Sequence, residues 1–252
     1  MTRWRLTRRA ALALPALLTA AAAGAVEEAQ ALLRAVDRAL EPASYEMYRK
    51  IINIEPSGAR KEFVLYSAKK GRDRVVAVFL APASEKGRST LRLGENMWLY
   101  IPEVGRPVRI TSLQSVIGGV FNNSDILRLD YDEEYRAERM ERDGAQIVLH
   151  LKARTDAVAY DRLKMWVETA RPLPTRIDCH AADGLLVKTL RFSQVRTFGG
   201  GIERPAQIDT ESPLFRGYRS VMLYDGIRAR ELPDEAFSLG FLPRVESLRG
   251  GA

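Results

Sequence analysis

Short apolar runs separated by turn-forming residues fill most of this chain after residue 44, and this pattern constrains the fold more than any other feature. Asp143-Gly144 and Asp183-Gly184 lie between such runs, and Asp-Gly pairs are a strong signal for tight hairpins. The pattern predicts a mainly β fold with an antiparallel meander. The expected strands cover residues 45–54, 63–68, 74–80, 90–93, 97–101, 108–110, 136–142, 147–152, 163–168, 175–179, 186–193, 202–209 and 218–224.

One amphipathic helix is expected ahead of the strands, over residues 26–40. Its apolar side chains recur at helical spacing, Glu27 and Glu28 lie near the positive end of the helix dipole, and Pro42 stops the helix. Two later segments do not have the pattern of strands: residues 112–124, expected to form a loop or short helix, and residues 234–242, where Asp234 is a candidate cap for a short C-terminal helix.

The N-terminus has the features of a secretory signal peptide, predicted to cover residues 1–25. Four arginines precede an uncharged, mostly apolar run of residues 10–25, and Ala23-Gly24-Ala25 offers small residues for cleavage. The run is shorter than the about 20 apolar residues of a membrane span, and Pro15 interrupts it. Arg8-Arg9 fits a twin-arginine signal, so both the Tat and the Sec route stay open. The alternative is an amphipathic helix retained in the mature protein.

The mature chain, residues 26–252, is expected to be a single domain that is nearly balanced in charge. The whole chain has 39 Lys and Arg against 32 Asp and Glu; four arginines and no acids precede residue 26, which leaves 35 against 32. This balance, without a basic block, gives no support to nucleic-acid binding. Cys179 is the sole cysteine, so we expect no intramolecular disulfide. We also expect a monomer.

The motifs that would indicate an enzyme are absent from the sequence. There is no Gly-x-Ser-x-Gly, His-Glu-x-x-His, Walker-type loop or Cys-x-x-Cys. Only His150 and His180 could serve as imidazole bases, and Cys179 and His180 are strand neighbours that point to opposite faces. Gly199-Gly200-Gly201 lacks the Lys and Ser/Thr of a phosphate loop and is expected to form a hairpin loop. We therefore expect no catalytic residue, with a hydrolase as the remote alternative.

An acidic cluster precedes the strand expected at residues 136–142. It consists of Asp130, Asp132, Glu133 and Glu134. A calcium loop would need a glycine where Tyr135 stands, so the cluster is interpreted as a solvated entry into a strand. We expect neither a metal site nor a cofactor.

Two of the expected strands, residues 75–80 and 97–101, are apolar on both faces, so both sides of the sheet must be covered. These can be ordinary core strands under a helix and loops, or part of an apolar cavity in which each buried methylene of an acyl chain contributes about 0.8 kcal/mol. The candidate lipid-binding residues are two same-face pairs, Phe63 with Leu65 and Trp98 with Tyr100, together with Phe79.

Two stretches carry a resemblance to a known family. Residues 96–110, Asn-Met-Trp-Leu-Tyr-Ile-Pro-Glu-Val-Gly-Arg-Pro-Val-Arg-Ile, form a strand-turn-strand unit, and residues 118–127 add a loop of small residues, Phe121 and Asp125. Together they resemble the outer-membrane lipoprotein-sorting (LolA-like) family, in its divergent branch, and the likeness extends over residues 26–247. The resemblance implies a strongly curved, unclosed antiparallel sheet, a half barrel of about 11 strands, with a few helices covering its concave face.

The resemblance also implies a functional theme. Family members carry acylated lipoproteins across the periplasm, and a relative senses stray lipoproteins or lipopolysaccharide. For this chain it implies a periplasmic carrier or chaperone for lipoproteins or other lipids, with an RND-type inner-membrane transporter as a partner. A periplasmic sensor or docking module without transport stays open as the alternative.

Overall fold

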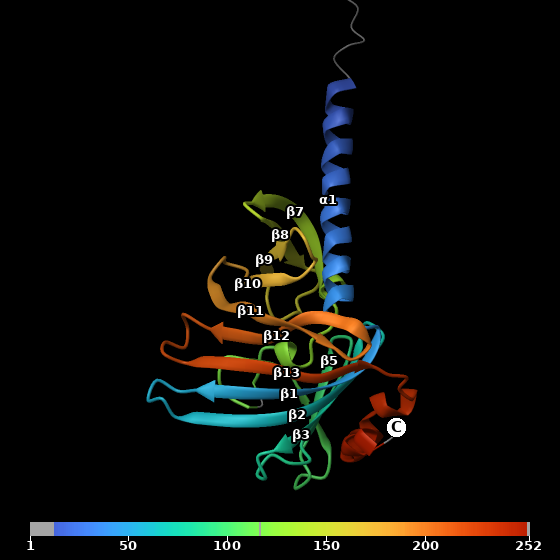
Figure 1. Ribbon diagram of the computed structural model, residues 1–252, viewed down its shortest axis with the longest axis vertical. Helices are drawn as coiled ribbons and strands as arrows, with labels where there is room; N and C mark the ends of the chain where they lie inside the picture. Colours follow the sequence, from blue (N-terminus) through green and yellow to red (C-terminus); the bar gives the residue numbers. More distant parts are fainter. Residues whose placement is uncertain (1–12, 116, 251–252) are drawn as a thin grey trace, which may run out of the picture.

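The computed structural model describes residues 13–115 and 117–250 and contains one antiparallel sheet of 13 strands. The order is β6-β5-β4-β3-β2-β1-β13-β12-β11-β10-β9-β8-β7. β1 pairs with β13, so the first and last strands of the chain are neighbours near the middle of the sheet, while β6 and β7 form its edges. Figure 1 shows that the sheet curves strongly without closing. The predicted fold class is confirmed.

The strands lie where the sequence pattern predicted them, and the number of about 11 strands that the resemblance implied was too low. The two Asp-Gly pairs lie in hairpin turns, where Gly144 and Gly184 have the positive φ values of 59° and 86° that glycine tolerates best. The strands are β1 Ser44–Ile54, β2 Arg60–Lys70, β3 Arg74–Ala81, β4 Ser89–Leu93, β5 Asn96–Tyr100, β6 Pro107–Ile110, β7 Tyr135–Asp143, β8 Gln146–Ala153, β9 Arg162–Glu168, β10 Pro174–His180, β11 Leu186–Phe198, β12 Ile202–Glu211 and β13 Arg219–Ala229.

Helices are few, and only the first is long. α1 spans Ala13–Leu40 and ends just before Pro42, as expected, but begins earlier than residue 26. The others are α2 Asn123–Ile126, α3 Tyr131–Glu134, and the 3₁₀ segments η1 Gly199–Gly201, η2 Asp234–Phe237 and η3 Leu239–Gly250. η1 is the tip of the hairpin between β11 and β12, as predicted. Asp234 begins η2, but its side chain does not cap the helix.

The predicted signal peptide falls partly outside the described residues, and residues 13–25 form the first turns of α1. Residues 23–28 are exposed, and the buried face of the helix begins at Ala29 and continues through Leu33, Val36 and Leu40. Among the side chains described, from residue 23 onward, packing on the domain begins after the predicted cleavage site. Within the described residues, no helix combines the length and apolar composition needed to cross a bilayer.

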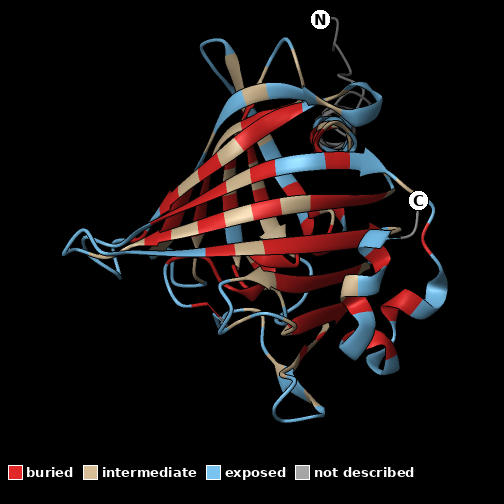
Figure 2. Cartoon of the chain, turned by 60° about the horizontal axis from the view of Figure 1, so that its bottom comes forward, coloured by how far each residue is buried: buried red, intermediate tan, exposed pale blue. Residues whose placement is uncertain are grey.

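The inner, concave face of the sheet is filled by the connection between β6 and β7. We call this connection, residues 111–115 and 117–134, the plug; it contains α2 and α3. Its side chains Ile117, Phe121, Ile126 and Leu129 join the main core with inward-facing residues of the strands and the buried face of α1. Figure 2 shows the buried positions concentrated along the curved strands around this interior.

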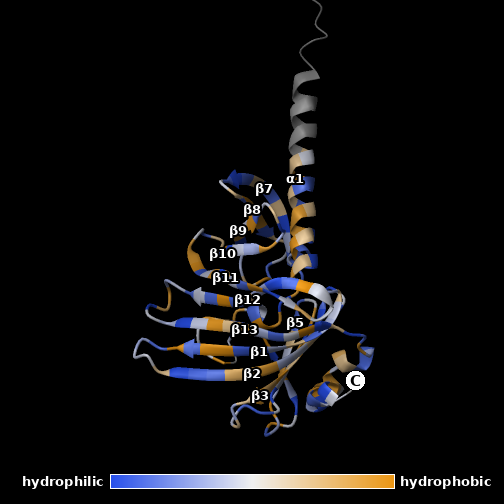
Figure 3. Ribbon diagram, in the orientation of Figure 1, coloured by the Kyte–Doolittle hydropathy of each residue, from blue (hydrophilic) through white to orange (hydrophobic). Residues whose placement is uncertain are grey.

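Within the described residues, the cover of the outer, convex face lies over β1–β5. There the C-terminal segment, residues 232–250, forms a second core with outward-facing residues such as Tyr66, Val76 and Leu91. This explains the continuous apolar run of β3, which is buried on both faces, as predicted from residues 75–80. β9, by contrast, alternates buried and partly exposed residues. Figure 3 shows apolar residues in the C-terminal segment and along the lower part of α1.

Candidate functional site

A small cavity lies inside the half barrel, between the plug and strands β9–β13. Its volume is about 40 Å³, which has room for only a few water molecules. Most of the wall is apolar and comes from the sheet, including Leu163, Ile177, Leu190, Ile208 and Met222. The roof comes from the plug and the last residue of α1, and includes Leu40, Phe121, Ser124, Asp125, Arg128, Tyr131 and Glu134.

Buried polar side chains of the sheet hold the irregular backbone of the plug. Asn53 on β1 donates to the carbonyls of Ile117 and Gly118, both at 3.1 Å. Arg49 on the same strand donates to Ile126 O at 2.5 Å, and Arg92 on β4 donates to Leu127 O at 3.1 Å. Because buried carbonyls need partners, these side chains replace the backbone ladder that the plug lacks.

Lys188 holds the part of the plug around Val120 and Asp125. Its ammonium group donates to Val120 O at 2.9 Å and makes an ion pair with Asp125, and both charged side chains are buried. The ammonium also lies 5.2 Å from the ring centre of Tyr160, a cation–π distance. Asp125 is placed by the capping box that begins α2, in which it accepts from Asn122 N at 2.9 Å.

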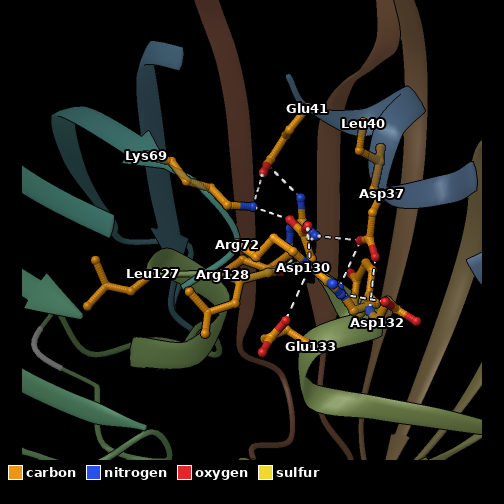
Figure 4. A network of polar contacts seen from close by, with 12 residues as sticks. Asp37, Leu40, Glu41, Lys69, Arg72, Leu127, Arg128, Asp130, Asp132 and Glu133 are labelled. Carbon is orange, nitrogen blue, oxygen red and sulfur yellow. Dashed lines mark hydrogen bonds and ion pairs between the residues drawn. The ribbon is translucent and has the colours of Figure 1, made fainter. Parts of the chain in front are cut away.

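A buried ion cluster joins the end of α1 to both the plug and the sheet (Figure 4). Glu41 lies at its centre, 2.7 Å from Arg128 of the plug, 3.4 Å from Lys69 of β2 and 3.3 Å from Arg204 of β12. Burial alone would raise the pKa of Glu41, but the charges of Arg128, Lys69 and Arg204 outweigh it and lower the pKa. Glu41 is therefore an ionised carboxylate that ties three parts of the fold together.

Asp37, one turn earlier on α1, caps the N-terminus of α3. Its carboxylate accepts from the backbone N–H groups of Tyr131 at 2.8 Å and Asp132 at 2.9 Å. Burial raises its pKa to about 6, although Arg128, 3.6 Å away, acts in the opposite direction. Asp37 is thus the carboxyl of this cluster that titrates nearest to neutral pH.

The acidic cluster that precedes β7 is buried, and the interpretation as a solvated strand entry is wrong. Asp132 and Glu134 are buried, and Glu133 is the exposed member. Asp130 makes an ion pair with Lys69, Asp132 with Arg72, and Glu134 with Arg92. The acids lie in α3 and pair with basic side chains of the sheet that are distant in sequence, so a local charge pattern could not identify their partners.

The five predicted lipid-binding residues lie on two different faces. Phe63, Leu65 and Phe79 belong to the inner core, where the Phe63 and Phe79 rings pack edge to face with centres 6.3 Å apart. Trp98 and Tyr100 face outward and pack against the second core under the C-terminal segment. None of the five lines the small cavity. The two predicted pairs therefore lie on opposite faces of the sheet, and the role of the five residues in binding stays a prediction.

Cys179 and His180 lie on opposite faces of β10, as expected. Cys179 is fully buried in the wall of the cavity, and burial raises the pKa of its thiol. His180 is partly exposed, and a register shift separates the two residues in the pairing with β11. A buried thiol with a raised pKa is a poor nucleophile, so Cys179 acts as an apolar wall residue.

One sequence pattern on β1 indicates the site but was not used in the prediction. On β1, Met47, Arg49, Ile51 and Asn53 share the inward face, so two polar residues interrupt an otherwise apolar stripe. An inward arginine requires a buried acceptor, which here is the plug backbone. Among the described residues, no group of three or more His, Cys, Asp and Glu side chains has the geometry to hold a metal ion.

Comparisons with known proteins agree with this architecture. A family model described only as "-like: Uncharacterized protein" matches residues 71–244. No protein with a curated description matches the chain. A LolA superfamily protein from Nitrosomonas europaea is 27% identical, with a TM-score of 0.77 over 84% of this chain and 98% of its own.

Two further solved structures share the fold at lower identity. A DUF1329 family protein from Desulfovibrio piger is 22% identical, with a TM-score of 0.74 over 86% of this chain and 99% of its own. A domain assigned as an outer membrane lipoprotein-sorting protein from Vibrio parahaemolyticus is 19% identical, with a TM-score of 0.72 over 87% of this chain and 100% of its own.

Proposed function

Because this chain belongs to the family matched over residues 71–244, a divergent branch of the LolA-like superfamily, we propose that it is a periplasmic carrier of acylated lipoproteins or other lipids. The acyl chains bind between the plug and the inner face of the half barrel. The hydrophobic gain of about 0.8 kcal/mol for each buried methylene supplies the affinity.

The observation that supports this proposal is the apolar inner wall of the half barrel. The plug, which is not part of the sheet, covers this wall. The present cavity of about 40 Å³ is far below the roughly 300 to 1,000 Å³ of ligand sites, so cargo enters only when the plug moves. The plug is joined to the sheet by apolar packing and by side-chain contacts to its backbone, and both must give way for cargo to enter. Phe63, Leu65 and Phe79 border the same interior and are proposed to contact the cargo.

The filled interior also favours one alternative. A regulatory or docking module that acts without transport would keep the plug in place and bind a protein partner on its surface. Such a protein would show the small cavity observed here and would not bind acyl chains. The two functions therefore differ in whether the plug can be displaced by lipid.

The proposal includes export and delivery. The signal peptide of residues 1–25 directs the chain to the periplasm, where an RND-type inner-membrane transporter is the proposed source or receiver of the lipid. The exposure of residues 23–28, on both sides of the predicted cleavage site, supports cleavage before residue 26. N-terminal sequencing of the exported protein tests this point: an intact Met1 in a cytoplasmic fraction would contradict it. No catalytic step is proposed.

The central test combines lipid extraction with a binding titration. We expect acyl species in mass spectra of lipid extracted from the purified mature protein, and saturable binding of a fluorescent fatty acid. Leu190→Ala and Ile208→Ala change the cavity wall and should change the affinity for the probe. Val78→Ala is the matched control, because Val78 is also buried but lies in the outer core.

The outcomes separate the two functions. Altered probe affinity in both wall variants, with an unchanged affinity for Val78→Ala, supports the carrier. An empty protein without saturable probe binding contradicts it and favours the docking module.

A further inference from the structure

Exposed apolar side chains gather on loops at one end of the half barrel. Leu214 is 51% exposed, Phe215 54% and Tyr218 40%, all in the loop between β12 and β13. Leu185, 51% exposed, lies at the neighbouring hairpin of β10 and β11, and Leu113, 60% exposed, begins the plug. In Figure 1 the loop between β12 and β13 projects on the side opposite the C-terminal segment. We call these five residues the apolar tip.

Two arginines flank the apolar tip without acidic partners. Arg216 and Arg219 are exposed, and no ion pair of either is found among the described residues. The acidic side chain nearest in the ladder, Glu211, is already paired with Arg191 at 2.6 Å. The loop therefore presents apolar and aromatic side chains next to two exposed arginines, with Glu211 opposite Arg219 already paired with Arg191.

A groove lies beside the apolar tip and close to the inner cavity. Its volume is about 330 Å³, and its lining includes Leu113, Val120, Val187, Leu214 and Phe215. Phe121 also lines it and forms part of the roof of the inner cavity. A single buried side chain thus borders both spaces, so the groove lies next to the roof of the inner cavity.

We propose that the apolar tip docks on an anionic membrane surface, which places the mouth of the groove against the lipid. Leucine and aromatic side chains on projecting loops can enter the boundary between headgroups and acyl chains, while Arg216 and Arg219 attract anionic headgroups. A protein partner would need a broader complementary surface than a few loop tips provide. The docking goes beyond the carrier function, because it does not depend on which cargo the interior holds.

Vesicle co-sedimentation of the mature protein tests this inference. We expect binding to vesicles that contain phosphatidylglycerol and weak binding to pure phosphatidylcholine. L214S/F215S should weaken binding to the anionic vesicles by at least about tenfold. R216Q/R219Q should weaken it by about 30-fold, at about 1 kcal/mol for each arginine near the surface. Added salt should weaken the wild type more than R216Q/R219Q.

The matched control uses another hairpin that carries an exposed valine and an exposed arginine. Val104 and Arg106 lie in the turn between β5 and β6, and V104S/R106Q should bind vesicles as the wild type does. Equal binding by all variants, or no binding to any vesicle, would overturn the inference, and the second result would favour a protein partner. Loss of vesicle binding in L214S/F215S with an unchanged affinity for a soluble fatty-acid probe would separate docking from cargo binding.

Discussion

The two covers of the sheet differ in how deeply their ion pairs are buried. Side-chain donors hold the backbone of both covers, since Ser89 donates to Leu242 O at 2.7 Å in the outer cover and Arg92 to Leu127 O at 3.1 Å in the plug. The C-terminal segment covers the outer face through side chains such as Phe237, Phe241 and Leu242, and its carboxylate Asp234, which pairs with Lys70 and Arg74, is 75% exposed. The plug covers the inner face with apolar side chains too, but its backbone and its acids are held by buried basic groups, including Arg92 and Lys188.

This difference indicates how precisely each cover is positioned. Apolar packing is non-directional, so its stabilisation is lost gradually. A buried ion pair holds one geometry, and a buried charge left without its partner is strongly unfavourable. The outer cover is therefore suited to stabilise the sheet, and the plug is suited to occupy one defined closed position. A carrier needs such a cover on the face that holds its cargo.

The largest expected effect comes from breaking one plug contact. Arg92→Met removes the partner of buried Glu134 and the donor to Leu127 O. We expect a loss of about 3 to 5 kcal/mol in the free energy of unfolding, measured by urea denaturation. Arg74→Met is the matched control at the outer cover, where the exposed pair with Asp234 should contribute about 1 kcal/mol or less. Equal losses in the two variants would remove the distinction between the covers.

The next effect tests the outer cover as a purely stabilising layer. Phe241→Ala truncates a buried ring of the second core and should cost about 3 to 4 kcal/mol of unfolding free energy. Its affinity for an acyl probe should stay unchanged, because the ring is on the opposite face from the cavity. Leu239→Ala, at an exposed position of the same segment, should change stability by no more than about 0.5 kcal/mol. A weakened probe affinity in Phe241→Ala would show that the outer cover also controls the interior.

Asp37 gives the contact between α1 and the plug a pH dependence. Its pKa rises from the ordinary value of 3.8 in the unfolded chain to about 6 in the fold, so the folded state holds the proton more tightly. The stabilisation is complete below about pH 4 and is lost as the pH rises through 6, by at most about 3 kcal/mol for two pKa units.

The measurement is the difference in unfolding free energy between the wild type and Asp37→Asn across pH 4 to 7. This difference should fall as the pH rises, because Asp37 loses its proton and with it the stabilisation. The contribution of Glu41 is common to both proteins and cancels. A difference that is constant with pH would mean that Asp37 has an ordinary pKa.

The sequence predicted the outer cover better than the plug. Continuous apolar runs at residues 75–80 and 97–101 required cover on both faces, and the structure confirms that β3 has it. The plug depends on pairs such as Lys69 with Asp130, which are 61 residues apart. Periodicity reports local burial, whereas ion pairing across a curved sheet depends on which strands become neighbours, so Asp130 and Asp132 looked solvated in sequence.

The smallest expected effect tests the assignment of the aromatic residues to the two faces. Trp98 is only partly buried, its ring lies 5.3 Å from the guanidinium of Arg109, and it faces the C-terminal segment. Trp98→Ala should therefore cost about 1 to 2 kcal/mol, less than the truncation of a fully buried ring, and should leave the affinity for an acyl probe unchanged. Phe79→Leu, on the inner face, is expected to lower that affinity while the protein stays folded. Fatty-acid titrations of both variants, together with thermal melts, measure the two effects.

One outcome would contradict this assignment of faces. If Trp98→Ala weakened the affinity for the probe and Phe79→Leu did not, lipid would bind on the outer face and the C-terminal segment would be the cover that moves.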